Sequence, residues 1–322
     1  MRIAWKISGA AVACTIFGTA PLLAQDTELP EIALQHIQQA DEIAGDDKLL
    51  QIMRTYHCYY VDPEDAQFRP SPRERNDLLF GTKFLDNVWY LGYMNIGMFV
   101  IETTEGLILV DGGADPDDGP KILKWLVDNG FTTDDIAYVI VTHEHGDHYG
   151  GIPFLKSVDP DIKLIVGSAA EWDEEMAEFA PFDMEIDEQT ELTVGETNIT
   201  LVPTPGHTPG TISAFIDVQV DGEERVASFW GGKGMRPNVE NLEIMVDSVA
   251  TFSALSEELN ATVPLNTHGW GDATVSRMID QVLMPEMNSP FVMTETQAAS
   301  NNEILNQCTV AYLEAVRAGG IK

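Results

Sequence analysis

Basic residues are scarce in this sequence. Its 322 residues include 18 lysines and arginines against 52 aspartates and glutamates, which gives a formal net charge of −34. A surface of this sign repels phosphate backbones and anionic lipid headgroups, so a nucleic-acid partner is not expected. The charge indicates solubility, and by itself it says little about function.

Cysteine is also scarce, with three residues in the whole chain. This excludes a disulfide-framework mini-protein. Apolar residues make up 44% and charged residues 22% of the chain, which is ordinary for a globular protein and excludes a disordered tail. The length allows one large domain or two smaller ones, with a sizeable buried core in either case.

Long hydrophobic runs are limited to one, from Ile7 to Leu23, which follows the basic residues Arg2 and Lys6. This order is typical of a secretory signal peptide, with cleavage expected after Ala24. A membrane anchor is the alternative, but the run is short for a span and contains glycine and proline. We therefore expect an exported, periplasmic protein without a stable membrane anchor.

Cleavage would remove Cys14 and leave Cys58 and Cys308. In an oxidising compartment these two could pair, which would tie the N-terminal part of the chain to its C-terminal helix. Two free buried thiols are the alternative, because a sequence gives no distance between cysteines. Both remain open at this point.

The chain divides into a signal peptide (1–24), an N-terminal arm (25–83) and a main domain with a C-terminal helix (84–322). Apolar spacing in the arm predicts one or two short helices, followed by an irregular, proline-rich connector. The connector prolines are Pro63, Pro70 and Pro72.

The main domain alternates apolar runs with helical patterns, which predicts two sheets sandwiched between helices. The expected strands are Val88–Met94, Met98–Glu102, Leu107–Val110, Ala137–Thr142, Lys163–Val166, Thr190–Thr204, Thr211–Val220, Arg225–Trp230 and Pro264–His268. Helices are expected around residues 122–127, 169–179 and 242–255. A last helix is expected after a capping box formed by Ser300 and Glu303.

Three of the seven histidines fall within six residues, His143-Glu144-His145-Gly146-Asp147-His148, directly after the expected strand 137–142. In an extended segment, residues two apart face the same way, so His143 and His145 can reach one metal ion together. Gly146 allows a sharp turn, after which Asp147 and His148 can aim at a second position. Three ligands with an open fourth position are typical of catalytic zinc.

The remaining ligands are expected from turns elsewhere in the chain. His207 lies in the segment Thr204-Pro-Gly-His-Thr-Pro-Gly210, and His268 lies in Asn266-Thr-His-Gly-Trp270 at the end of a short strand. His36 and His57 lie in the N-terminal arm, outside any such turn, and are interpreted as surface or structural histidines.

These motifs resemble those of the metallo-β-lactamase superfamily over roughly residues 84–275, including an early Asp111-Gly-Gly turn. The resemblance implies an αββα four-layer sandwich with two Zn²⁺ per chain along one edge of the sheets. It places His143, His145 and His207 on the first ion and Asp147, His148 and His268 on the second. Asp111 would orient these ligands by a hydrogen bond, or it would be a plain turn residue.

The segment between His207 and His268 departs from many superfamily hydrolases, which place a metal-bridging aspartate there. This chain has no acid from Val226 through Val239 and no cysteine nearby. The resulting ligand set resembles the third subclass of class B β-lactamases. Lys233 departs from the serine usual in that subclass; it could pair with the carboxylate of a β-lactam, or point to solvent.

The resemblance therefore implies an exported zinc-dependent hydrolase whose small-molecule substrate is a β-lactam. Its amide would be opened by a metal-bound hydroxide that Asp147 orients as the catalytic residue. A hydrolase of a lactone, thioester or other ester on the same site is the first alternative. An iron-dependent oxidoreductase of the superfamily and a non-enzymatic exported zinc-binding protein are the others.

Overall fold

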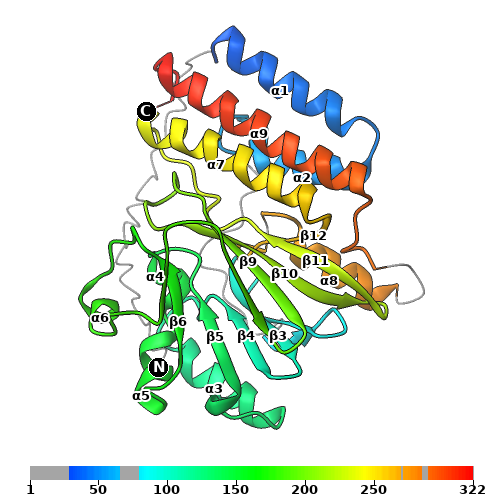
Figure 1. Ribbon diagram of the computed structural model, residues 1–322. Helices are drawn as coiled ribbons and strands as arrows, with labels where there is room; N and C mark the ends of the chain where they lie inside the picture. Colours follow the sequence, from blue (N-terminus) through cyan, green and yellow to red (C-terminus); the bar gives the residue numbers. More distant parts are fainter. Residues whose placement is uncertain (1–28, 66–79, 270, 285–288, 322) are drawn as a thin grey trace, which may run out of the picture.

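A computed structural model describes residues 29–65, 80–269, 271–284 and 289–321 of the chain (Figure 1). The predicted signal peptide, Pro70 and Pro72 lie outside these residues. Within the described part, no helix has the length and apolar character needed to cross a membrane.

Two sheets form the centre of the structure. The first has seven strands in chain order, antiparallel from β1 to β4 and parallel from β4 to β7. Its strands are β1 (Thr82–Lys83), β2 (Val88–Gly92), β3 (Gly97–Thr103), β4 (Gly106–Val110), β5 (Ile136–Ile140), β6 (Leu164–Gly167) and β7 (Met184–Ile186).

The second sheet has five strands in the order β12-β11-β10-β9-β8, and only the β11–β12 pair is parallel. Its strands are β8 (Thr190–Val194), β9 (Thr197–Pro203), β10 (Ile212–Val220), β11 (Glu223–Phe229) and β12 (Ala261–Leu265).

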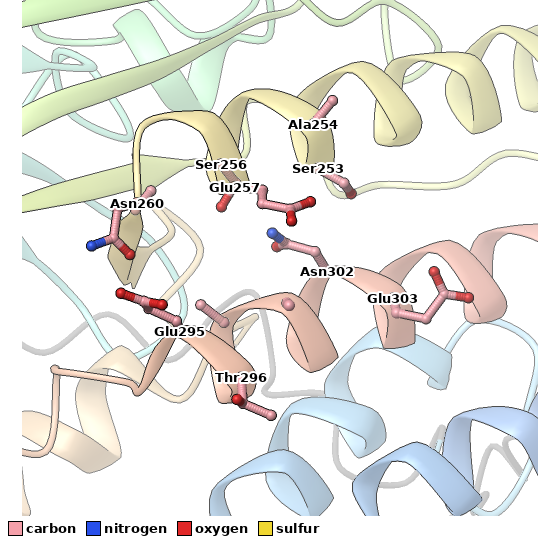
Figure 2. Close-up of a pocket in the computed structure, with 12 residues that line it drawn as sticks. Ser253, Ala254, Ser256, Glu257, Asn260, Glu295, Thr296, Asn302 and Glu303 are labelled. Carbon is pink, nitrogen blue, oxygen red and sulfur yellow. The ribbon is translucent and has the colours of Figure 1, made fainter.

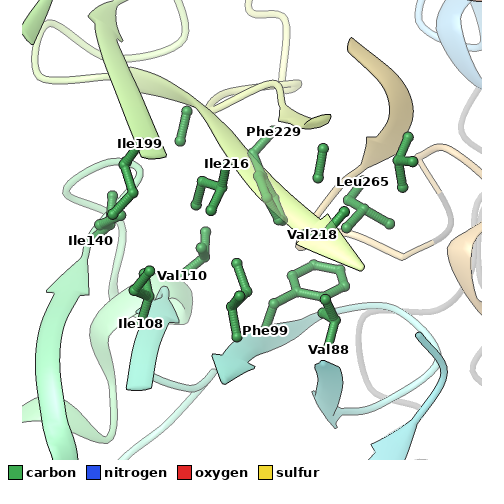
Figure 3. Close-up of a cluster of buried hydrophobic side chains, with 14 of the residues drawn as sticks. Val88, Phe99, Ile108, Val110, Ile140, Ile199, Ile216, Val218, Phe229 and Leu265 are labelled. Carbon is green, nitrogen blue, oxygen red and sulfur yellow. The ribbon is translucent and has the colours of Figure 1, made fainter. Parts of the chain in front are cut away.

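The main core lies between the two sheets, as Figure 3 shows. A second core lies between the first sheet and the helices outside it. Strand β4 contributes to both cores, because successive residues of a strand point to opposite faces of the sheet. Ile108 and Val110 face the second sheet, whereas Leu107 and Leu109 face the helices on the outer side. Each such side chain, fully buried, contributes about 1.5–3 kcal/mol.

Helices cover both outer faces, which confirms the predicted αββα sandwich. Apolar residues of α3 (Asp118–Asp128) and α5 (Ile152–Val158) pack on the first sheet. Those of α7 (Val239–Glu258) and α9 (Glu295–Arg317) pack on the second. The remaining helices are α1 (Glu31–Ala44), α2 (Lys48–Cys58), α4 (Gly146–Tyr149), α6 (Glu174–Ala177) and α8 (Thr274–Leu283), with a 3₁₀ turn at Thr133–Asp135.

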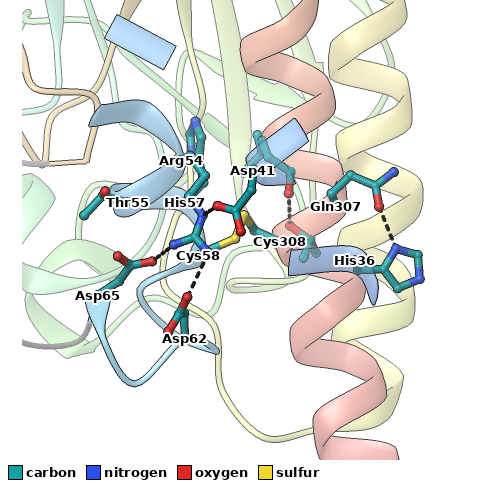
Figure 4. Close-up of a disulfide and its surroundings, with 12 residues drawn as sticks. His36, Asp41, Arg54, Thr55, His57, Cys58, Asp62, Asp65, Gln307 and Cys308 are labelled. Atoms are coloured by element: carbon teal, nitrogen blue, oxygen red, sulfur yellow. Dashed lines mark hydrogen bonds and ion pairs between the residues drawn. A yellow bond between two sulfur atoms is a disulfide. The ribbon is translucent and has the colours of Figure 1, made fainter. Parts of the chain in front are cut away.

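The arm forms two helices, α1 and α2, which lie against α9. A disulfide joins Cys58 of α2 to Cys308 of α9, so the cysteines are paired rather than free (Figure 4). Beside it, Arg54 forms ion pairs with Asp41 at 2.6 Å and with Asp62 at 2.8 Å, and a further one with Asp65. The helical layer formed by α1, α2 and α9 is therefore held by packing, a covalent link and a charge cluster.

The predicted start of the last helix was wrong. Helix α9 begins at Glu295, where the Thr294 side chain accepts from the backbone N–H of Gln297 and the Gln297 side chain accepts in return from the backbone N–H of Thr294. Both Thr294-x-x-Gln297 and Ser300-x-x-Glu303 fit a capping box, but only Thr294 has the extended backbone that an N-cap requires. The helix predicted at 169–179 is also shorter, since Asp173 caps α6 by accepting from the Met176 N–H.

Candidate metal centre

The end of strand β5 presents alternate side chains to opposite sides, as the sequence predicts. His143 and His145 face the same cluster, with ring centroids 4.8 Å apart. Glu144, between them, points away and accepts from Thr208 Oγ1 at 2.6 Å and from the Gly210 N–H at 3.3 Å. Glu144 thereby fastens the strand end to the turn that carries His207.

Two triads result, each with its potential ligand atoms within 4.8 Å of one another. The first triad is His143, His145 and His207; the second triad is Asp147, His148 and His268. They adjoin, because the rings of His143 and His148 lie 3.9 Å apart. The structure thus brings together all six residues that the resemblance assigned to two metal ions.

Backbone carbonyls orient three of the histidines. Nδ1 of His143 donates to the Gly231 carbonyl at 2.9 Å, Nδ1 of His207 donates to Gly234 at 2.6 Å, and Nδ1 of His268 donates to Asn95 at 3.2 Å. A carbonyl only accepts, so each Nδ1 carries the hydrogen and each Nε2 keeps its lone pair.

A metal ion fits the lone pairs that remain. Nε2 of His143 and Nε2 of His148 are fully buried and have no hydrogen-bond partner within the described residues. An unsatisfied buried acceptor is costly, and a cation at that position would satisfy it. The donor set of five imidazoles and one carboxylate suits a metal such as zinc.

Asp111 orients His148. Its Oδ2 accepts from His148 Nδ1 at 2.6 Å, and its Oδ1 accepts from the Thr142 N–H at 2.8 Å. Asp111 also has a left-handed backbone with φ of 67°, so it serves as the turn residue as well. Both interpretations offered by the sequence therefore apply to one side chain.

Burial and neighbouring charges set the protonation of the centre. Burial lowers the pKa of His207 to about 3 and that of His268 to about 4, so both are neutral and able to bind metal at pH 7. Burial would raise the pKa of Asp147, but His148 and His268 outweigh it and leave that pKa below its usual value. Burial also lowers the pKa of His148, yet the charge and hydrogen bond of Asp111 raise it overall.

Lys233 does not point to solvent, contrary to one of the two predicted orientations. Its side chain is buried, its Nζ donates to the Gly271 carbonyl, and the same Nζ lies 3.3 Å from His57 Nδ1. Burial lowers its pKa to about 7, although Asp272 acts in the opposite direction. The physical reason is the packing of the arm, because α2 places His57 over this segment. His57 is accordingly buried and structural, and His36 bonds Gln307 at 2.6 Å, outside both triads.

Sequence reasoning missed Arg236. This exposed residue places Nη2 3.4 Å from His145 Nε2, beside the first triad. An exposed arginine close to a metal centre can bind an anionic group. Its signal in the sequence was only a basic residue three positions after Lys233 in a strongly acidic chain.

Cavity size does not locate this centre. A groove of about 710 Å³ lies between the end of α7 and the start of α9, and none of the six triad residues lines it. Figure 2 shows Ser256, Glu257 and Asn302 along it. It holds no histidine, and the chemistry of the two triads is better evidence of function than this volume.

Comparison with known proteins agrees with this geometry. Residues 95–222 match the family model described as Metallo-beta-lactamase superfamily. A subclass B3 metallo-beta-lactamase of Bradyrhizobium japonicum superposes with a TM-score of 0.54 at 22% identity, covering 73% of this chain and 92% of that one.

Curated relatives are named for other activities. "Glyoxylase B2" of Dictyostelium discoideum is 24% identical over 119 residues, covering 33% of this chain and 40% of that protein. "Hydroxyacylglutathione hydrolase" of Pseudomonas putida is 25% identical over 206 residues, covering 56% and 76%. The chain thus spans less than half of the first relative and about three quarters of the second.

The fold and the paired triads define a metal-binding protein of the αββα sandwich class. More specifically, residues 95–222 match the metallo-beta-lactamase superfamily, and this part of the chain resembles that family in both sequence and fold.

Proposed function

We propose that the protein is an exported zinc-dependent hydrolase that opens the amide bond of β-lactams. The observation that carries this proposal is the segment from Trp230 to Gly234. Where many superfamily hydrolases place a metal-bridging aspartate, this chain offers the carbonyls of Gly231 and Gly234, which orient His143 and His207. The ligand set is then three histidines beside Asp-His-His, the set of the third β-lactamase subclass.

The first triad would hold one zinc ion and the second triad the other. When bound, two such ions supply an ionised water at neutral pH and polarise the carbonyl of the substrate. His143 and His148 form the buried floor of the centre, whereas the Asp147 side chain is 44% exposed and lies at its open side.

Asp147 and Arg236 act on the reactants. Asp147, ionised at neutral pH, accepts a hydrogen bond from the attacking water and orients it. Arg236 at the mouth donates to the carboxylate that β-lactams carry, the role that the sequence had suggested for Lys233. A buried Lys233 that already donates to Gly271 is less suited to that contact.

The test is hydrolysis of a panel of penicillins, cephalosporins and carbapenems by the mature protein, with and without a chelator. Turnover that the chelator removes and Zn²⁺ restores is the expected result. Protein carrying about two zinc ions without turnover of any member would overturn β-lactam hydrolysis while leaving the metal centre in place.

Thioester hydrolysis is the second candidate, because the Pseudomonas relative is named a hydroxyacylglutathione hydrolase. Lactones and other esters would use the same site. The same preparation should be assayed with acyl-glutathione thioesters, and a preference for these over every β-lactam would favour this candidate. Metal analysis distinguishes the iron-dependent oxidoreductase, since zinc is redox-silent.

Export is part of the proposal. The basic and apolar order of residues 1–24 supports it, and so does the Cys58–Cys308 disulfide, which persists in oxidising compartments. N-terminal sequencing of the protein from a periplasmic extract should begin at Gln25. An uncleaved Met1 in that fraction would contradict this expectation.

A further inference from the structure

A chain of hydrogen bonds runs behind the metal centre and starts in the helical layer. Asn301 of α9 offers its Oδ1 at 3.0 Å from Nε2 of His57, which lies on α2. Because this amide oxygen accepts, Nε2 of His57 carries the hydrogen, and Nδ1 is free to accept from Lys233 Nζ at 3.3 Å. The Nζ also donates to the carbonyl of Gly271.

Both ends of this contact support metal ligands. On one side, Gly231 and Gly234 flank Lys233 in the chain, and their carbonyls orient His143 and His207 of the first triad. On the other side, the Gly271 N–H donates to the carbonyl of His268, a member of the second triad, at 2.6 Å. Lys233 therefore joins the backbone segments that orient the two triads.

We propose that Lys233 is a positioning residue of the metal centre, which fixes the loop of His268 against the segment 231–234. It makes no contact with substrate in this role. It acts through the Gly271 carbonyl. Loss of its amino group should therefore disturb the position of His268 more than that of His143 or His207. The inference rests on the two-ion centre of the proposed function.

The surroundings leave this lysine little freedom. A cavity of about 30 Å³ lies among His57, Lys233, Asp272 and Asn301, which is room for about one water molecule and no larger group. A Cβ added at Gly271 would meet Lys233 Cδ at 2.8 Å and Nζ at 3.2 Å. Glycine at this position thus allows the close approach of the amino group to the loop.

The first triad has an independent support. The Gly231 N–H donates to Ser213 Oγ at 3.1 Å, and this contact holds the segment to strand β10 whatever occupies position 233. A substitution at Lys233 should therefore lower the metal affinity of the second triad and leave that of the first triad unchanged.

The decisive variant is Lys233→Met, made in the whole chain with the disulfide intact. Methionine keeps a long apolar side chain but cannot donate to Gly271. We expect the affinity for the second Zn²⁺ to fall about 10–100-fold while that for the first is unchanged. Competition with a chromophoric chelator measures both affinities, and the Co²⁺ absorption spectrum shows which ion changes. Lys124→Met is the matched control, because the Lys124 side chain is 74% exposed.

Two results would overturn the proposal: unchanged affinity for both ions, or an equal loss at both. A wild-type protein that takes up only one ion would overturn the two-ion centre as well, and that result appears before any substitution is made. If Lys233→Met does not fold, Gly271→Ala displaces the same amino group from the loop side. It should weaken the second ion selectively. In a Lys233→Ala background the added Cβ still approaches the His268 carbonyl at 3.0 Å but no longer meets the lysine, so the further loss should be smaller than in the wild-type background.

Discussion

The metal centre and the helical layer are held by different means. In the centre, each ligand comes from a separate strand end or turn, and its direction depends on single contacts such as Asp111 to His148 at 2.6 Å. In the helical layer of α1, α2 and α9, apolar packing is spread over many side chains and reinforced by the Cys58–Cys308 disulfide. Metal binding in the centre therefore depends on the exact position of a few side chains, whereas the stability of the helical layer depends on the summed burial of many.

This difference predicts two kinds of mutational response. A change in the centre should remove metal and activity while leaving the fold, because the sheets pack without the ligands. A change in the helical layer should lower the free energy of unfolding while leaving the chemistry. Lys233 is where the two regions meet, through His57.

The largest effect is expected from His143→Ala. This removes the most buried ligand of the first triad, and hydrolysis should fall by more than about a thousandfold, since a catalytic metal supplies several kcal/mol. Steady-state turnover with the Zn²⁺ content measured in parallel provides the test. His36→Ala is the control, because His36 lies outside both triads. Wild-type turnover by purified His143→Ala would contradict the assignment of the centre.

The next effect belongs to the helical layer. Replacing both Cys58 and Cys308 by serine should lower the free energy of unfolding by about 2–5 kcal/mol, because the link constrains the unfolded chain. Urea denaturation of metal-free protein measures this loss. The number of Zn²⁺ ions bound should not change. A disulfide-free variant with normal stability and one Zn²⁺ ion fewer would contradict this, because the helical layer would then support metal binding instead of stability.

The sequence predicted the centre better than the contacts that support it. Three histidines at the end of a strand have a recognisable spacing, and alternation placed His143 and His145 on one side without any structure. The carbonyls of Gly231 and Gly234 have no such signal, since every residue carries one. The orientation of Lys233 depends on α2, which lies about 180 residues earlier in the chain, and no local pattern reports such a distance.

Asp111→Asn tests the contacts of the second triad. The amide keeps the shape but loses the charge, and its nitrogen cannot accept from His148 Nδ1. Affinity for the second ion should fall about 10–100-fold. Metal titration is the measurement, and Asp117→Asn on the exposed surface is the control. A uniform loss of stability without a change in metal affinity would make Asp111 a turn residue alone.

Arg236→Ala tests whether Arg236 contributes to substrate binding or to the chemical step. If Arg236 holds the substrate carboxylate, KM should rise about tenfold with kcat little changed, since uniform binding is lost. Initial rates over a range of substrate concentrations give both constants. Arg225→Ala is the matched control, because Arg225 lies near the start of β11 and pairs with Glu223 instead of a metal ligand. A fall in kcat at unchanged KM would instead show that Arg236 stabilises the transition state and not the bound substrate.

The smallest effect concerns the start of α9, where two capping boxes compete in the sequence. Thr294→Ala removes the side chain that accepts from the Gln297 N–H, so the free energy of unfolding should fall by about 1 kcal/mol. Ser300→Ala should have almost no effect, because Ser300 lies inside the helix, where alanine is well tolerated. Thermal unfolding of the two metal-free variants side by side measures the difference. If Ser300→Ala were the destabilising change, the helix would begin six residues later, and the contact of Gln297 with Asp47 at 2.8 Å, which joins α9 to the cap of α2, could not form.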